Sequence, residues 1–390
     1  MSIKTCLVTG QYPPEVGGVG HSAYRVANLL ASRGLQVHVV ALQKHPEPLP
    51  FEECYTSAQE GETLVHRVKV YHPAITPGAS EAEILTRYNR EMFHALERFQ
   101  LRFGYDVLHA FFLYPAGFIA GLVGRLHGAR VIASIRGNDV GKYVFDPLRL
   151  GFVRMALENA NYVTSVATSL SDLADRAITP IAHKVKTILN SVDLERLQPQ
   201  AKPALDLHGL VIGAAGLFRY KKGLIYLFKA LACLQNEFDF TLLLAGDYFK
   251  PEDRAPHEQA LAELGLTERT IVTGKIPHER MADYLQLIDV LVFPSLFSEG
   301  CPLAMLEGMA LGKVIIGARA GAIPEIIRDH ENGLLVNPGS SEEIAQALRV
   351  VAQDPALRER LATNAAATAH SMTHEREFED WMEVYRAAGA

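Results

Sequence analysis

The chain alternates short apolar runs with longer amphipathic segments, and this alternation stops once and then restarts. Apolar runs typical of buried strands precede residue 200, namely KTCLVT, LQVHVVAL, TLVHRVKV, YDVLHAFF, ARVIASI and NYVTSV. The same kind of run returns after residue 208 as LVIGAAG, TLLLAGD, TIVTGK, DVLVFPS and KVIIGA. Between the runs lie helical patterns such as residues 81–99, where apolar residues recur at three- and four-residue steps. Such alternation predicts mostly parallel sheets covered on both faces.

The interruption predicts two domains. The chain has 390 residues, more than one ordinary core holds. The segment QPQAKPALDLHG has no hydrophobic period and reads as a linker. We therefore expect an α/β protein with two Rossmann-like, doubly wound domains, over residues 1–200 and 205–370. A helical pattern over residues 374–390 follows.

Composition excludes several classes of protein. A net charge of −6 argues against a nucleic-acid binder. The four cysteines, Cys6, Cys54, Cys233 and Cys301, stand singly without metal-ligand spacing, so a reduced cytoplasmic chain is expected. The opening MSIKTCLVTG does not resemble a secretion signal. Residues 107–124 lack Asp, Glu, Lys and Arg, but their glycines and Pro115 predict a buried strand, a turn and a helix rather than a membrane span.

A glycine-rich turn follows the first predicted strand. In PPEVGGVG, Gly17, Gly18 and Gly20 stand just before a helix, where backbone amides can approach a phosphate. A turn that only packs is the alternative. A dinucleotide-binding fingerprint fits poorly, because residues 12–14 (YPP) interrupt its spacing and VVALQKH lacks the acidic residue that would hold a ribose.

A basic turn opens the second predicted domain. In GLFRYKKG, we expect the strand to end at Gly216 and residues 222–223 to open a helix, LIYLFKALACL. Arg219, Lys221 and Lys222 crowd this turn, although cations are unfavourable at a helix N-terminus. A bound anion would relieve that cost, and a solvated basic loop explains the pattern equally well.

Two glutamates mark the segment SEGCPLAMLEGMALGK. A buried strand is expected to end at Pro294, and a helix to begin near Pro302. Glu307 lies eight residues after Glu299. Ligands bind at the carboxyl ends of strands in open α/β sheets, so this loop is expected to face a ligand. Its candidate ligand-binding positions are Glu299, Gly300, Cys301, Pro302 and Leu303.

These motifs together resemble the retaining glycosyltransferases of family 4. SEGCPLAMLEGMALGK is similar to the family's E-x7-E region, GLFRYKKG to its diphosphate-binding turn, and PPEVGGVG to its N-terminal glycine loop. LNSVDLERLQP resembles the interdomain signature, although Ser191 replaces its glycine; AGAIPEII and ENGLLV resemble the segments that follow E-x7-E. The matches run in order from about residue 10 to 338. The resemblance implies a GT-B fold, in which two Rossmann-like domains face each other across a cleft and the terminal helix crosses back onto the first.

The resemblance also implies site roles. Glu307 would bind the donor ribose, Glu299 the donor sugar, and Lys222 the diphosphate, assisted by Gly17, Gly18 and the backbone of residues 300–303. The family often has arginine where this chain has Leu217, and Arg219 is the candidate substitute.

Three residues are acceptor-side candidates. Arg136 and Asp139 stand in RGND, where many family members have H-G-x-D, and Arg136 cannot be a general base. Asp139 either lines the acceptor side or caps a turn. His109, where members often have a histidine, is either a site residue or a core histidine.

The implied activity is transfer of a hexosyl group from a UDP- or GDP-sugar to an acceptor hydroxyl, with retention. Lys222, Arg219 and backbone amides would stabilise charge on the leaving diphosphate. No metal or other cofactor is expected, because the chain has no Asp-x-Asp pair. The alternatives are an epimerase or phosphorylase of the same fold, and a non-catalytic sugar-nucleotide-binding protein.

The expected partners are a nucleotide sugar and a glycan, lipid-linked or small-molecule acceptor, and no nucleic acid. Leu148, Leu150 and Phe152 stand beside Arg149 and Arg154, which fits either a buried helix or peripheral membrane contact. Burial is the favoured interpretation of this segment.

Overall fold

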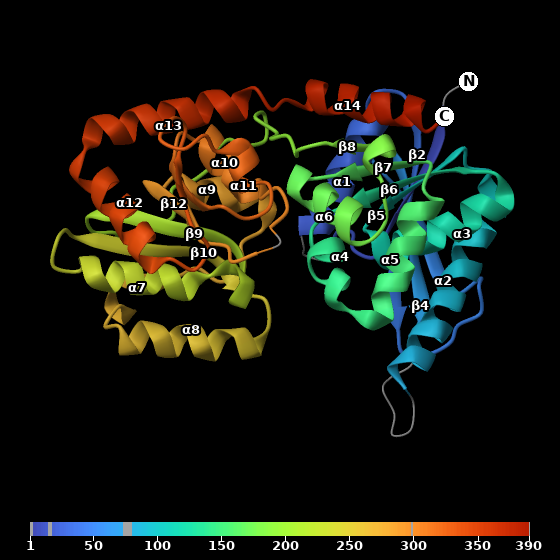
Figure 1. The fold of residues 1–390 in the computed structure, drawn as a ribbon, viewed down its shortest axis with the longest axis horizontal. Coiled ribbons are helices and arrows are strands. Elements are labelled where there is room, and N and C mark those ends of the chain that lie inside the picture. The colour runs from blue at the N-terminus through green and yellow to red at the C-terminus, as the bar shows by residue number, and fades with distance from the viewer. Residues whose placement is uncertain (1–2, 15–17, 73–79, 298, 390) are drawn as a thin grey trace. The chain divides into compact units, whose positions relative to one another are not determined.

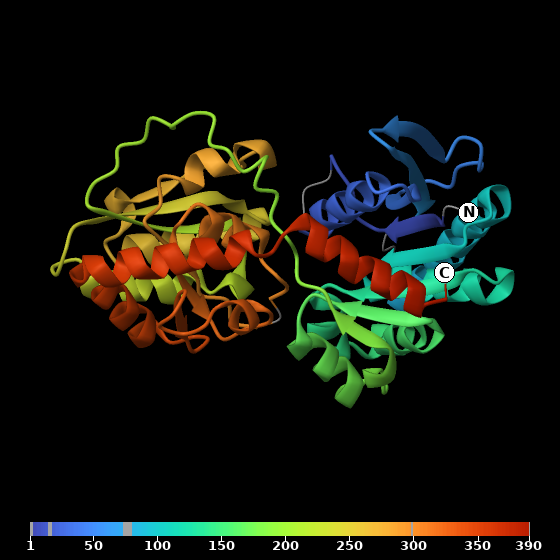
Figure 2. The same cartoon turned by 90° about the horizontal axis from the view of Figure 1, so that it is seen from above.

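The computed structural model describes residues 3–14, 18–72, 80–297 and 299–389 (Figures 1 and 2). Its contacts group into two compact units. Unit 1 comprises Met1–Leu189 with Glu375–Ala390, and unit 2 comprises Asn190–His374. Each unit has its own sheet and is described by itself.

The sheet of unit 1 has the strand order β3-β4-β2-β1-β5-β6-β7-β8. Its strands are β1 (Lys4–Thr9), β2 (Gln36–His45), β3 (Tyr55–Glu60), β4 (Thr63–Tyr71), β5 (Val107–Phe111), β6 (Arg130–Ile135), β7 (Tyr162–Ser165) and β8 (Val185–Thr187). Neighbouring strands are parallel except β3 and β4. In the central register, Leu7 pairs with Val39 on one side and His109 on the other. These central strands are buried on both faces, which explains their continuous apolar runs.

The helices of unit 1 cover both faces of this sheet (Figure 1). They are α1 (Gly18–Ala31), α2 (Glu81–Phe103), α3 (Phe118–His127), α4 (Asn138–Gly141), α5 (Pro147–Asn159), α6 (Thr168–Ala177) and α14 (His374–Ala387). Helix α2 shows why these boundaries form. Ser80 and Glu83 make a reciprocal capping box at its start, and Gly104 ends it with a φ of 59°.

Helix α14 completes the core of unit 1. Its Trp381, Val384 and Tyr385 pack with residues of β1, β2, β5 and α1 in one apolar cluster. Figure 2 shows α14 lying along one face of the sheet. The indole of Trp381 donates a hydrogen bond to the buried Glu377 at 3.1 Å, so the polar atom of this large side chain is satisfied.

The sheet of unit 2 has the order β11-β10-β9-β12-β13-β14, and its neighbouring strands are parallel. The strands are β9 (Leu210–Phe218), β10 (Phe240–Tyr248), β11 (Thr270–Val272), β12 (Val290–Phe293), β13 (Val314–Ala318) and β14 (Leu334–Val336). The helices are α7 (Leu224–Leu234), α8 (Pro251–Glu263), α9 (Met281–Leu285), α10 (Leu303–Ala310), α11 (Ile323–Ile326), α12 (Ser341–Gln353) and α13 (Pro355–His370). Helices α7 and α8 lie on one side of the sheet and α9 and α10 on the other (Figure 1).

The architecture confirms the predicted α/β class with two Rossmann-like sheets. Residues 107–124 form the buried strand β5, a turn over Leu113–Gly117, and most of α3, as predicted. In the described part of the chain, no helix is both long and apolar enough to span a membrane.

One boundary in the basic turn was predicted wrongly. Strand β9 continues past Gly216 to Phe218, because its ladder with β10 extends to the pair Phe218–Tyr248. The predicted helix LIYLFKALACL is confirmed as α7, which follows a 3-10 turn over Tyr220–Lys222 and has Gly223 as its N-cap residue.

Candidate functional site

The candidate site in unit 2 lies where the strand order reverses. The chain passes from β9 outward through β10 to β11, and then returns to the other side of β9 with β12. Ligands of open α/β sheets bind beside the carboxyl ends of strands at such a reversal. The basic turn follows β9, and the loop with Glu299 follows β12. Both predicted motifs therefore lie at the carboxyl ends of β9 and β12, the two strands that flank the reversal.

Backbone contacts hold these two segments together. The amide of Leu296 donates to the carbonyl of Lys221 at 2.9 Å. Gly223 has a φ of 69°, and a Cβ there would stand 2.0 Å from the carbonyl oxygen of Pro294. Only glycine allows both this backbone conformation and this close approach.

Lys222 and Glu299 form an ion pair at the centre of the site. The Lys222 Nζ lies 3.0 Å from both Glu299 carboxylate oxygens, and the hydroxyl of Ser295 donates to Oε2 at 2.8 Å. The side chains are 20% and 9% exposed, respectively. Burial opposes ionisation of Glu299, but Lys222, Lys221 and the hydrogen bonds outweigh it and hold its pKa below the usual range. Sequence analysis did not identify Ser295 as a residue of this site.

The other two cations of the turn differ in environment. Burial lowers the pKa of Lys221 to about 8, against the opposing attraction of Glu299. The Arg219 guanidinium lies 4.9 Å from the ring centre of Phe249. Its Nε is buried and has no hydrogen-bond partner among the described residues. A buried donor of this kind is costly unless a ligand or water satisfies it.

Glu307 lies on α10 and points a carboxylate oxygen at a histidine. Its Oε1 is 3.1 Å from Nε2 of His278, which lies on the 3-10 turn His278–Arg280. The hydrogen bond to Glu307 raises the pKa of His278 above its usual value. Sequence analysis missed His278. A histidine a few residues beyond a strand, in TIVTGKIPHER, was the available signal.

The backbone after Glu299 is fixed from two directions. The side-chain amide of Asn190 donates to the carbonyl of Cys301 at 2.7 Å. Gly321, in AGAIPEII, has a φ of 55°, and a Cβ there would fall 1.5 Å from the carbonyl oxygen of Glu299. Pro302 is the N-cap residue of α10 and Leu303 its first residue, so Gly300 leads directly into the helix N-terminus. Asn190 therefore holds the loop that carries the candidate site, and Gly321 allows the close approach of its backbone.

Unit 1 also has a strand-order reversal, between β1 and β5. The predicted glycine turn follows β1: Gly18 begins α1, whereas Gly17 lies outside the described residues. Arg136 follows β6, hydrogen-bonds Ser22 of α1 and lies 5.2 Å from the ring centre of Phe111. The structure thus brings Arg136 to the first turns of α1.

Asp139 is fully buried and holds backbone. Its carboxylate accepts hydrogen bonds from the amides of Leu113, Arg136 and Gly137. Burial raises its pKa to about 6, although these amides act in the opposite direction. Phe112, which precedes Leu113, has a φ of 101°, a strained conformation for a residue with a side chain. Asp139 therefore holds the backbone that follows β5 and β6.

His109 is a core residue in this structure. It is fully buried, with Nδ1 3.1 Å from the hydroxyl of Tyr385 and Nε2 2.9 Å from that of Ser134. The same hydroxyls reach Thr5 and Thr164, so a polar network links four strands and α14. Burial lowers the pKa of His109 to about 3 and keeps it neutral. Both ring nitrogens are thus occupied by the fold.

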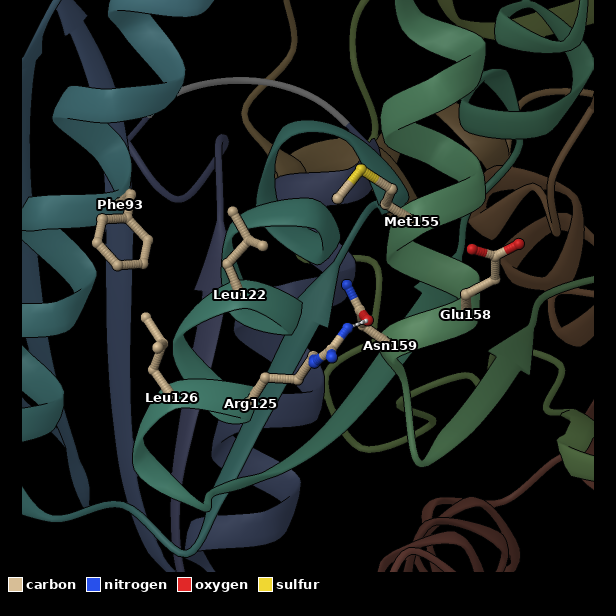
Figure 3. Close-up of a pocket in the computed structure, with 7 residues that line it drawn as sticks. All are labelled: Phe93, Leu122, Arg125, Leu126, Met155, Glu158 and Asn159. Atoms are coloured by element: carbon tan, nitrogen blue, oxygen red, sulfur yellow. Dashed lines mark hydrogen bonds between the residues drawn. The ribbon is translucent and has the colours of Figure 1, made fainter.

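A hollow of about 580 Å³ lies elsewhere in unit 1, among α2, α3 and α5 (Figure 3). Its lining consists of Phe93, Leu122, Arg125, Leu126, Met155, Glu158 and Asn159. The Arg125 guanidinium donates to Asn159 at 3.2 Å. None of the predicted site residues lines this hollow.

The segment with Leu148 and Phe152 is the helix α5, which is only partly buried. Val153, Ala156 and Leu157 form its buried face, whereas Leu148 is 42% exposed. Arg149 pairs with Asp146 and Glu81, each at 2.6 Å. The prediction that this segment is a buried helix therefore holds for one face of α5 and not for Leu148.

Two family models match the two halves of the chain in succession. "Glycosyltransferase Family 4" matches residues 16–196, and "Glycosyl transferases group 1" matches residues 198–368. Among curated proteins, the chain is 26% identical to N-acetyl-alpha-D-glucosaminyl L-malate synthase of Bacillus anthracis, over 90% of this chain and 89% of that one. It is 27% identical to a putative teichuronic acid biosynthesis glycosyltransferase of Bacillus subtilis, over 62% of this chain and 60% of that one.

Solved structures show the same fold. Sucrose-phosphate synthase of Thermosynechococcus elongatus superposes with a TM-score of 0.80 at 21% identity, covering 98% of each chain. HepE of Anabaena, solved in complex with UDP, superposes with a TM-score of 0.73 at 17% identity, covering 99% of this chain and 100% of that one. Both family models, the relatives and the two-domain GT-B architecture agree. The chain therefore belongs to the family 4 (group 1) glycosyltransferases, and it is a transferase enzyme.

Proposed function

We propose that this glycosyltransferase transfers a hexosyl group from a nucleoside-diphosphate sugar to an acceptor hydroxyl, with retention of configuration and without a metal ion. The observation that carries the proposal is the Lys222–Glu299 pair at the strand-order reversal of unit 2. Lysine has three N–H donors, and two of them satisfy the oxygens of Glu299. The third has no partner in the part of the chain that the structure describes, and it would bind a diphosphate oxygen.

The donor nucleotide is assigned to unit 2. Glu307 would accept hydrogen bonds from the ribose hydroxyls, and Glu299 from hydroxyls of the donor sugar. The amides at the start of α10 would face the diphosphate, because a helix N-terminus favours an anion. Solved complexes of HepE with UDP and with UDP-glucose support a uridine donor over a guanosine donor.

Catalysis would rest on charge stabilisation. Negative charge grows on the leaving diphosphate oxygen while the sugar becomes oxocarbenium-like. Lys222 and Arg219 would aim positive charge at that oxygen, and the otherwise unsatisfied Nε of Arg219 supports this role. These side chains supply the charge that a metal supplies in other enzymes, which supports the metal-independent scheme.

Retention would follow from attack on the same face as the departing group. The acceptor hydroxyl oxygen bonds to the anomeric carbon as the carbon–oxygen bond to the diphosphate breaks. The acceptor's proton passes to the leaving phosphate oxygen. Glu299 is already held by Lys222 and Ser295, which suits it to bind hydroxyls rather than to serve as a nucleophile.

The acceptor is assigned to unit 1, where Arg136 and the start of α1 lie at the other strand-order reversal. The acceptor is a glycan, a lipid-linked acceptor or a small molecule, and turnover with a panel of acceptors distinguishes these classes. We place the enzyme in the cytoplasm, free or peripheral to the membrane. The four cysteines are all free thiols in the structure, which suits a reducing compartment.

A donor-turnover assay tests the proposal. UDP- and GDP-hexoses are offered with and without an acceptor panel, in the presence of a chelator, and nucleoside diphosphate release is measured. We expect acceptor-dependent release that the chelator does not abolish, and a product whose anomeric proton signal matches that of the donor. Turnover without an acceptor would indicate an epimerase, and binding without turnover across the panel a non-catalytic protein.

A further inference from the structure

The turn over His278–Arg280 places one histidine directly on Glu307. Nε2 of His278 lies 3.1 Å from Oε1 of Glu307. The histidine side chain is 50% exposed and the glutamate side chain 11%. The contact therefore lies near the surface of unit 2, with the carboxylate mostly buried and the imidazole half-exposed.

This turn is held in place independently of His278. Arg280 pairs with the buried Asp283 on α9. Asp283 in turn accepts hydrogen bonds from the amides of Gln200 and Ala201, at 2.6 and 3.0 Å. The histidine thus stands on a fixed turn, so its contact with Glu307 has a defined geometry.

Neighbouring charged groups act on the pKa of His278. Glu307 is the strongest and favours the imidazolium, Glu279 acts in the same direction, and Arg196 opposes them. Desolvation also opposes protonation, but the net effect raises the pKa of His278. The imidazolium therefore persists to a higher pH than in an unfolded chain.

We propose that His278 is a positioning residue for nucleotide recognition, holding Oε1 of Glu307 so that Oε2 is directed at a ribose hydroxyl. The inference rests on the proposed role of Glu307 in the donor site. A carboxylate with one oxygen fixed loses less rotational freedom when the ribose binds. His278 therefore affects ligands that carry a ribose and leaves the diphosphate contact unchanged.

The test compares ligands with and without a ribose. UDP and GDP are titrated calorimetrically into the intact chain between pH 6 and 8.5, with inorganic pyrophosphate as the ribose-free probe. His278→Leu removes the donor, and His278→Gln keeps a neutral N–H donor. His208→Gln is the matched control, because His208 also lies 3.2 Å from a carboxylate, that of Asp206, on the surface of unit 2.

We expect His278→Leu to weaken the better-bound nucleotide about fivefold at pH 6, the range of a partly exposed ion pair. Its pyrophosphate affinity should stay within about twofold of wild type. Wild-type nucleotide affinity should fall as pH rises through the pKa of His278, since the imidazolium exists below it. His278→Gln should lose this pH dependence, and His208→Gln should behave as wild type.

Each outcome decides a separate point. Nucleotide affinity unchanged in His278→Leu at every pH would overturn the inference while leaving the donor site intact. Equal losses for nucleotide and pyrophosphate would also overturn it, because they indicate a general disturbance of the loop. Failure of the wild-type chain to bind UDP, GDP or pyrophosphate would instead overturn the proposed function, and the inference with it.

Discussion

The two units place polar residues at equivalent points of their sheets, but the fold uses them differently. At the reversal in unit 1, the Asp139 carboxylate accepts hydrogen bonds from the amides of Leu113, Arg136 and Gly137. Both ring nitrogens of His109 hydrogen-bond to hydroxyl groups. In unit 2, one N–H donor of Lys222 and one carboxylate oxygen of Glu307 have no partner among the described residues. Topology therefore locates a candidate site, whereas the hydrogen-bond partners of each side chain separate residues fully engaged by the fold from residues that can still contact a ligand.

The largest effect on activity should come from removing the positive charge of Lys222 in unit 2. Lys222→Met is expected to lower kcat about 10²- to 10³-fold, because it removes one donor to the leaving group. Steady-state kinetics with the preferred donor measures the loss. Because this change also leaves the buried Glu299 without its cation, Lys222→Met/Glu299→Gln serves as the second variant. It should recover thermal stability but not activity; recovered activity would assign Lys222 to structure.

Removal of Asp139 tests the contrasting role in unit 1. Asp139→Ala should lower the free energy of unfolding by about 2–4 kcal/mol, because it leaves several buried amides without an acceptor. Denaturant unfolding measures this. UDP or GDP binding by the folded variant should match wild type. Loss of nucleotide affinity without loss of stability would break the distinction between the two units.

His109 should show a smaller, pH-dependent effect. His109→Gln is expected to cost about 1–2 kcal/mol of stability near neutral pH, by disturbing the buried hydroxyl network. The pKa of His109 is about 3 in the folded chain and near 6.5 when unfolded. Its contribution is thus complete above pH 6.5 and declines as pH falls toward 3. Unfolding curves across this window should be flatter for the variant; a selective loss of kcat would instead indicate a site role.

The smallest effect concerns Lys221. Because its pKa is lowered to about 8, its charge is present below pH 8 and is lost above it. Nucleoside diphosphate affinity should therefore fall about two- to threefold between pH 7 and 9, as for a screened charge near the ligand. Lys221→Met should lack this step. A step of equal size in the variant would assign the titration to another group.

Much of the fold could be predicted because buried parallel strands have continuous apolar runs, as in YDVLHAFF and DVLVFPS. The edge strand β3 was missed, since YTSAQE is mostly polar and exposed. The end of β9 was misplaced because pairing with β10, rather than Gly216, sets it. The order of the motifs pointed to Lys222, Glu299 and Glu307 as candidate site residues. The hydrogen-bond partners of a side chain depend on tertiary contacts: Tyr385, whose hydroxyl contacts His109, lies 276 positions further along the chain.

The central claim is that Lys222 and its neighbouring loop hold the diphosphate of a nucleotide in unit 2. Its most direct test is calorimetric titration of UDP and GDP into the wild-type chain and into the folded Lys222→Met/Glu299→Gln variant. We predict that wild type binds at least one of the two and that the variant binds it at least about tenfold more weakly. Equal affinities in the two proteins would contradict the account.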